Sequence, residues 1–218
     1  EKIAHYQEAL REDQRGGMEP LLEVWQERRE KARARMILFL DSDEFAEFAE
    51  DFGDFLATPG AGVQDDEALV CHVVPRLVYE RVEAVRCYET ILNTAAIETL
   101  HALRIDFKRL RYTLEFFEEV LGQEAREVIN EVKTMQDHLG DLNDADVAGR
   151  ILQEFVADYE KRQAGVQVSE RRSIDRVIQY MADRAAEKHR LMVTFPEAWA
   201  RFNRPEIRRA LASAVAVL

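Results

Sequence analysis

Apolar residues recur every three or four positions in the stretch LHALRIDFKRLRYTLEFFEEVL, which runs from Leu100 to Leu121. This is the period of an α-helix that buries one side, so the stretch is predicted to be a helix packed on a core. The predicted core side consists of Leu100, Leu103, Phe107, Leu110, Leu114, Phe117 and Leu121. The roughly opposite side carries four potential cations at helical spacing, which are His101, Arg104, Lys108 and Arg111. Because Asp106 is the only acid between His101 and Tyr112, these cations repel one another, and we expect an anionic ligand beside them.

Helical period continues through nearly every other segment, and almost none alternates as a strand does. Helices are predicted at about residues 2–14, 20–40, 44–56, 67–92, 96–121, 124–139, 144–163 and 169–194, with a short one after Pro205. The segment Asp41-Ser42-Asp43 is predicted to cap the helix that follows it. Gly140 is predicted to end one helix at a corner where Asn143 or Asp144 caps the next. Short connections between long helices predict an all-α fold built of antiparallel bundles.

The clearest break in the chain is Thr58-Pro59-Gly60-Ala61-Gly62, which is expected to separate two halves. Before this break, four phenylalanines recur with a period of three to four, and we interpret them as core residues: Phe45, Phe48, Phe52 and Phe55.

Composition limits the classes of function. The net charge of −12 argues against nucleic-acid binding, which usually comes with a basic domain, so an anion site must be local. No apolar run is long enough to span a bilayer and no signal peptide opens the sequence, so we expect a cytoplasmic protein without membrane contact. Cys71 and Cys87 form no CxxC pair and are interpreted as reduced core cysteines, with a disulfide as the alternative.

Two other stretches are rich in cations. RREKARAR, residues 28–35, sets five bases against Glu30 alone, and such a run is usually a solvated helix face. In PRLVYERVEAVRCYE, Arg81 falls within the apolar sector, where an unpaired charge is costly. Arg81 is therefore expected either in a buried ion pair or at a cleft between helices.

The motifs of common catalytic sites are missing from the sequence. It contains neither GxxxxGKS/T nor GxGxxG, and its histidines form no HExxH, so no nucleotide loop, metal site or cofactor is expected. No Ser, Cys or carboxylate stands at an obvious spacing from His101 at which the two could form a catalytic pair. His101 is either a satisfied polar residue at a helix start or a contact to the anion.

Arginine forks suit phosphate oxygens, since they donate parallel charge-assisted hydrogen bonds.

The string LHALRIDFKRLRYTLEFF, followed by VKTMQDHLGDLNDADV, resembles the second repeat of the CHAD domain, the conserved-histidine α-helical domain. The pattern HxxRxxxKRxRY and the QDxLGxLND corner carry the resemblance, which extends more loosely to PRLVYERVEAVRCYE and FPEAWARF. It implies a single domain over residues 1–218 made of two pseudo-symmetric antiparallel helical bundles. Residues 1–57 are then a partial first repeat and residues 64–218 the second.

The resemblance also implies a function, because the family is associated with binding inorganic polyphosphate on a basic surface or cleft, and some members are found on polyphosphate granules. By position it implicates His101, Arg104, Lys108, Arg109, Arg111, Tyr112 and Lys133. Looser matching adds Arg28, Arg29, Arg35, Arg81 and Arg86. A complete domain of this type opens with its own HxxRxxxRRxR helix, which does not precede EKIAHYQEALRE. Part of the anion-binding surface is therefore expected to be missing, with a low affinity as the result.

The leading hypothesis is a non-enzymatic binding module for polyphosphate or a similar polyanion. One alternative is a phosphohydrolase that acts on polyphosphate or a nucleoside triphosphate, which would need carboxylates clustered beside the basic stripe. Another is a helical scaffold whose basic stripe binds an acidic protein.

Overall fold

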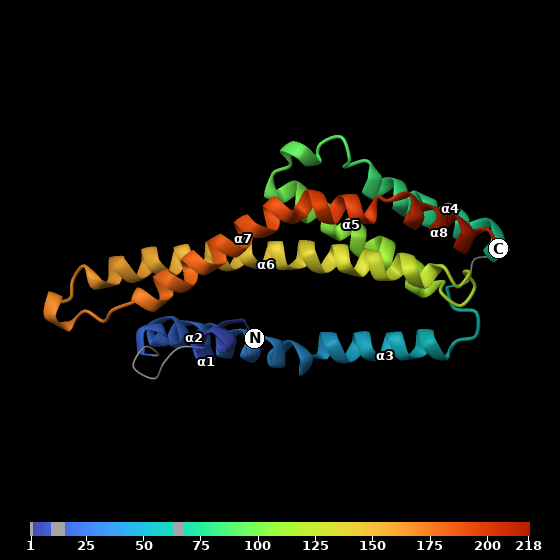
Figure 1. Cartoon of the computed structure of the whole chain (residues 1–218). Helices are drawn as coiled ribbons and strands as arrows, with labels where there is room; N and C mark the ends of the chain where they lie inside the picture. Colours follow the sequence, from blue (N-terminus) through green and yellow to red (C-terminus); the bar gives the residue numbers. More distant parts are fainter. Residues whose placement is uncertain (1, 10–15, 63–67) are drawn as a thin grey trace. The chain divides into compact units, whose positions relative to one another are not determined.

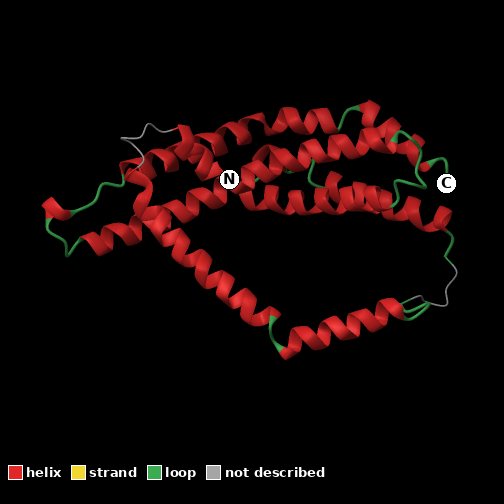
Figure 2. Cartoon of the chain, turned by 90° about the horizontal axis from the view of Figure 1, so that it is seen from below, coloured by secondary structure: helices red, strands yellow, loops and turns green. Residues whose placement is uncertain are grey.

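The computed structural model describes residues 2–9, 16–62 and 68–218, and the regular elements in these ranges are all helical (Figure 2). The all-α prediction is therefore confirmed. The α-helices are α1 (Lys2–Ala9), α2 (Glu19–Leu40), α3 (Asp43–Ala57), α4 (Val70–Arg86), α5 (Ile97–Phe116), α6 (Ala125–Gln163), α7 (Asp175–Phe202) and α8 (Pro205–Val215). Short 3-10 turns also lie in the connections, among them η2 (Leu92–Thr94) and η3 (Val168–Glu170).

The helices group into two compact units. The first unit comprises Glu1–Glu67 with Glu154–Tyr180, and the second unit comprises Ala68–Gln153 with Met181–Leu218. Helices α6 and α7 are long enough to contribute one end to each unit. The resemblance implied a partial first repeat over residues 1–57 and a second repeat over residues 64–218, and this division stays a prediction. In the structure, residues 154–180 group with the N-terminal part.

The core of the second unit is built around one side of α5. Its buried residues are Leu100, Leu103, Phe107, Leu110 and Leu114, as the apolar period predicted. The Phe107 ring lies 4.9 Å from the Phe202 ring and 6.3 Å from the Trp199 ring, both at steep angles. Helices α4 and α8 run close together in Figure 1, and residues of both line one small apolar cavity. Because α5 buries this side, its opposite side is left for polar residues.

Among the residues that the structure describes, fewer are buried in the first unit. Met18 and Leu21, at the N-terminal end of α2, are fully buried, and Phe155, Val177 and Tyr180 are buried at the ends of α6 and α7. Pro20 stands in the first turn of α2, as predicted.

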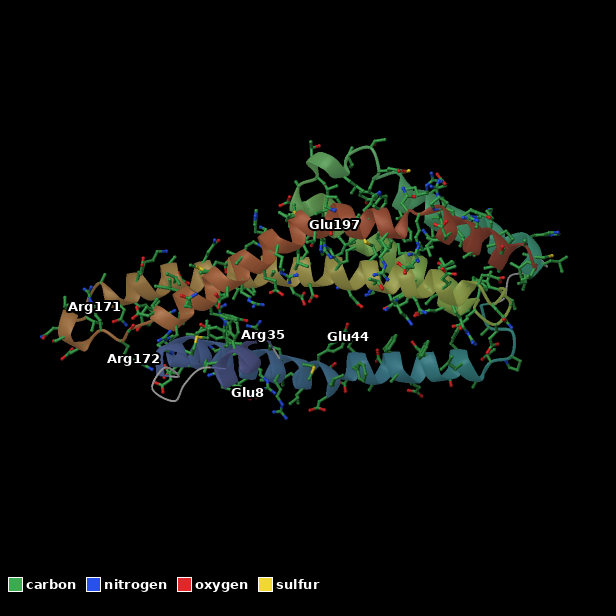
Figure 3. The ribbon with its side chains drawn as sticks, in the orientation of Figure 1. Glu8, Arg35, Glu44, Arg171, Arg172 and Glu197 are labelled. Carbon is green, nitrogen blue, oxygen red and sulfur yellow. The ribbon has the colours of Figure 1, made fainter. Side chains whose placement is uncertain are left out.

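An ion-pair cluster lies at this end of the first unit. The guanidinium of Arg172, labelled in Figure 3, donates to the carboxylates of Glu19 and Glu23 at 3.1 to 3.3 Å. These ion pairs join the segment before α7 to α2.

Helix α6 corrects one prediction, because it continues through Gly140 from Ala125 to Gln163 without a corner. A glycine inside a helix costs about 1 kcal/mol relative to alanine. Leu139 and Leu142, on either side of it, are each 1% exposed. Burying a leucine stabilises by about 1.5 to 3 kcal/mol, so packing outweighs the glycine.

Helix α3 corrects another, because none of its residues is buried. Phe48, Phe52 and Phe55 are 59%, 49% and 48% exposed, and Phe45 is half-buried. The rings lie along the helix with neighbouring centroids 5.9 to 6.3 Å apart. The period predicted an apolar side correctly, but these rings cover one another instead of entering a core.

Helix ends agree with the predictions where a cap residue marks them. The Ser42 side chain accepts a hydrogen bond from the Phe45 amide at 3.3 Å, and α8 begins at Pro205. Helix α7 begins at Asp175 rather than at Ser169, which lies in η3 instead. A capping box would need Glu or Gln three residues after Ser169, but Arg172 stands there, so Ser169 does not start the helix. The predicted end of the first helix at residue 14 and the predicted start at residue 67 fall outside the described residues.

The two cysteines are free. The prediction that they are core residues is wrong, since Cys71 is half-buried and Cys87 is exposed. Cys87 directly follows α4 as its C-cap.

Candidate functional site

The polar side of α5 is presented as the sequence predicted. His101, Lys108 and Tyr112 are exposed, while Arg104 and Arg111 are half-buried. They share one side of the helix because the buried leucines and Phe107 occupy the other.

Helix α6 lies against this side of α5 at three places. The Nδ1 atom of His101 lies 2.8 Å from the Asn143 Oδ1 atom, a hydrogen bond in which the imidazole nitrogen is the donor. Gly140 faces Arg104, because a Cβ atom on this glycine would lie 3.7 Å from the Arg104 Nε atom. Lys133 reaches the carboxylate of Glu115, near the end of α5, at 3.2 Å. The surface formed by His101, Arg104, Lys108, Arg111 and Tyr112 of α5 with Lys133 of α6 is called the α5–α6 face below.

The two arginines of this face are only partly satisfied. The Nε atoms of Arg104 and Arg111 are buried and have no hydrogen-bond partner among the described residues. Within the described ranges, no carboxylate pairs with Arg104 or Lys108. A buried donor without an acceptor costs about 1 to 3 kcal/mol. The face therefore has positive charge on Arg104 and Lys108 that an anion would neutralise.

Tyr112 lies among these cations. Its ring centroid is 4.9 Å from the Arg111 guanidinium carbon and 5.6 Å from the Lys108 ammonium. Both distances allow cation–π attraction, which holds the two charges beside one another. Tyr112 thus orients the basic side chains without neutralising them.

Glu115 is the residue of this surface that the sequence analysis missed. Its two carboxylate oxygens lie 3.7 Å from Arg111 Nε and 3.2 Å from Lys133 Nζ. A signal was present in the sequence, since Glu115 follows Arg111 by four positions, the spacing of a helical ion pair. Its contact with Lys133 depends on how α6 packs and has no signal in the local sequence.

Arg109 is not brought to the α5–α6 face. Its guanidinium pairs with Asp106 at 3.1 Å, one turn back along α5. Asp106 also accepts a hydrogen bond from the Tyr88 hydroxyl at 2.9 Å. Burial raises the pKa of Tyr88, and the hydrogen bond and negative charge of Asp106 raise it further.

Arg86 lies on the other side of α5. It pairs with Glu83 at 3.4 Å and lines a small cavity together with the buried Leu110 and Phe202. Arg81 is half-buried, and no carboxylate of the described residues pairs with it, so the expected buried ion pair is not found there.

The remaining predicted residues belong to the first unit. Arg28, Arg29 and Arg35 project from the exposed stretch of α2, where Arg35 is labelled in Figure 3. In the same stretch Lys31 pairs with Glu27 at 2.6 Å. These arginines form a basic surface of the first unit, in agreement with the solvated face that the charge run indicated.

Two further features of the described residues bear on the site. The described residues contain no group of three or more His, Cys, Asp and Glu side chains arranged to hold a metal ion. Among them, no helix combines the length and apolar character needed to cross a membrane.

A family model described as the CHAD domain matches residues 1–153, a range that contains α5 and the part of α6 that faces it. A search of curated proteins found no match to the chain.

Proposed function

The chain belongs to the CHAD domain family, and we propose that it binds inorganic polyphosphate, or a similar polyanion, on the α5–α6 face without catalysing a reaction. The observation that carries the proposal is the pair Arg104 and Lys108, which no carboxylate of the described residues neutralises. The association of the family with polyphosphate points to the same ligand.

A linear polyanion suits this geometry. Its charges repeat along the chain, and the cations of α5 repeat along one side of a helix. Each phosphate bound by a lysine or arginine releases counterions, so several modest contacts add up to a salt-dependent affinity.

The charge of the whole chain supports selectivity for a thin, flexible polymer. With a net charge of −12, the protein repels a duplex that approaches over a wide area. A single strand of phosphates needs only the width of the α5–α6 face. The proposed role implies a cytoplasmic protein that associates with polyphosphate granules.

The predicted residues contribute unequally under this proposal. Direct contacts are assigned to His101, Arg104, Lys108, Arg111, Tyr112 and Lys133. Arg109 and Arg86 are held by acids of their own helices, so they act on the ligand mainly through their long-range field. Arg28, Arg29 and Arg35 offer a separate basic surface on the first unit, and Arg81 is assigned no contact.

Calorimetric titration with long-chain polyphosphate at low salt tests the proposal. Arg104→Glu combined with Arg111→Glu places two acids on the face, and we expect the affinity to fall at least about tenfold. The control is Arg208→Glu with Arg209→Glu on α8, which changes the net charge equally at two exposed positions. A similar loss in both double variants would show that only net charge matters and would contradict a local site.

The non-catalytic part of the proposal has its own test. We expect no orthophosphate release from polyphosphate or from ATP in the presence of Mg²⁺ or Mn²⁺. Release that disappears in the Arg104→Glu, Arg111→Glu variant would make the protein a phosphohydrolase instead.

A further inference from the structure

A cavity of about 610 Å³ opens in the second unit where the basic stripe of α5 ends. His101, the last residue of the stripe toward the helix N-terminus, lines it together with Asn143, Asp146, Arg150 and Lys188. His101 therefore belongs both to the α5–α6 face and to this cavity.

Two cations that sequence analysis did not single out are fixed in the cavity wall by one acid. Asp146 binds the Lys188 ammonium at 2.6 Å through Oδ1 and the Arg150 Nε atom at 3.2 Å through Oδ2. The Asp146 side chain is only 14% exposed, so it holds both partners in place. Lysine has three donors and arginine five, so each keeps donors for a ligand.

The N-terminus of α5 supplies further donors. Ile97 and Glu98, its first two residues, line the cavity. The N-cap residue is Ala96, whose side chain makes no capping hydrogen bond. Amides of a first helical turn have no partner within the helix, and together with the helix dipole they attract anions.

The cavity is nevertheless weak as a site on its own. Asp146 and Glu98 offset the charges of Arg150 and Lys188, so these four side chains have no net formal charge. A free phosphate ion gains little there. A phosphate tethered to a chain that is already held on the α5–α6 face binds at a high effective concentration, which overcomes this weakness.

We infer that this cavity receives the terminal phosphate of a linear polyphosphate whose internal phosphates lie on the α5–α6 face. A terminal phosphate has one more non-bridging oxygen than an internal one and needs donors on several sides. A cavity provides them, whereas a helix side contacts a passing chain from one direction. The inference rests on the proposed function, and it assigns Lys188 and Arg150 as the residues that recognise chain ends.

The test compares two small polyphosphates of similar total charge at neutral pH, linear tripolyphosphate and cyclic tetrametaphosphate, which has no ends. Calorimetry at low salt should show that the wild type binds the linear ligand about five- to tenfold more tightly, as one charge-assisted contact predicts. Lys188→Ala should remove most of this preference, and Arg150→Gln should reduce it. Lys161→Ala, which removes the same charge from an exposed position of α6, should leave it intact.

Equal affinity of the wild type for both ligands would overturn the inference, as would a preference that survives in both Lys188→Ala and Arg150→Gln. Thermal melts of each variant establish that it is folded. Long-chain polyphosphate separates this result from the proposed function. If the long chain binds and depends on Arg104 and Arg111, only the recognition of ends fails; if the wild type binds no polyphosphate of any length, both fail.

Discussion

Glu115 lies on the same side of α5 as the basic residues and holds two of the cations assigned to the ligand, Arg111 and Lys133. It therefore competes with a bound polyanion for both. We expect Glu115→Gln to raise the affinity for polyphosphate about two- to fivefold at low salt, the value of one partly exposed ion pair. The measurement is the same calorimetric titration.

The matched control for this prediction is Glu119→Gln. Glu119 is exposed, lies one turn further along the chain and pairs with no cation of the described residues. We expect Glu119→Gln to change the affinity for polyphosphate less than twofold. An equal rise in both variants would mean that Glu115 acts only through net charge.

Tyr88 carries a prediction about pH. Its folded-state pKa is raised by burial and then by Asp106, so the folded state retains a proton that the unfolded state releases above about pH 10. The stabilisation is complete below the unfolded pKa and is lost as the pH rises through the folded one. We expect Tyr88→Phe to be less stable than the wild type at pH 7 by about 1 kcal/mol, the value of the lost hydrogen bond.

Thermal melts from about pH 9 to about pH 11.5 should show this difference shrinking, because only the wild type loses the contribution of the Tyr88 hydroxyl. A difference that stays constant across the window would contradict the assignment of the Tyr88–Asp106 contact.

At the residue scale, the sequence predicted which side of α5 is basic, because the period of Leu103 and Phe107 determines the buried side. It did not predict which cations stay unpaired. That distinction depends on rotamers and on the packing of α6, which bring Glu115 to Lys133 and leave Arg104 facing Gly140.

At the element scale, Gly140 tests whether α6 is continuous. The structure places it inside the helix, without a positive φ, and an added Cβ would meet Arg104 at an ordinary van der Waals distance of 3.7 Å. We therefore expect Gly140→Ala to stabilise the protein by roughly 0.5 to 1 kcal/mol, measured by chemical denaturation.

A helix that ended at Gly140 would give the opposite sign, because alanine is strained in the left-handed conformation typical of a C′ position. Gly149→Ala is the control, since this glycine also lies within α6 and nothing meets its added Cβ within 4 Å. A loss of stability in Gly140→Ala alone would restore the corner that the sequence indicated.

Helices were predictable where a local signal decides the outcome, such as the Ser42 cap or the proline that opens α8. Long-range packing decided the exceptions. Burial of Leu139 and Leu142 keeps α6 continuous through a glycine, and the rings of α3 are exposed although their period is that of a buried side. A hydrophobic period predicts an apolar side but not what covers it.

At the scale of the whole molecule, the account describes a chain of net charge −12 with a small surface of opposite sign on its second unit. Such an arrangement concentrates affinity in a few cations, so binding should weaken with salt in proportion to their number. With Arg104, Lys108, Arg111 and Lys133 in contact, single-strand counterion release predicts that log K falls with log salt with a slope of about −3.

The central claim is tested most directly by this slope, measured for long-chain polyphosphate with the wild type and with Arg104→Gln combined with Arg111→Gln. Removing two contacts should make the slope shallower by about 1.4, to roughly half its wild-type value. A wild-type slope near zero, or a slope that is unchanged in the double variant, would contradict the claim that the α5–α6 face binds the polyphosphate chain.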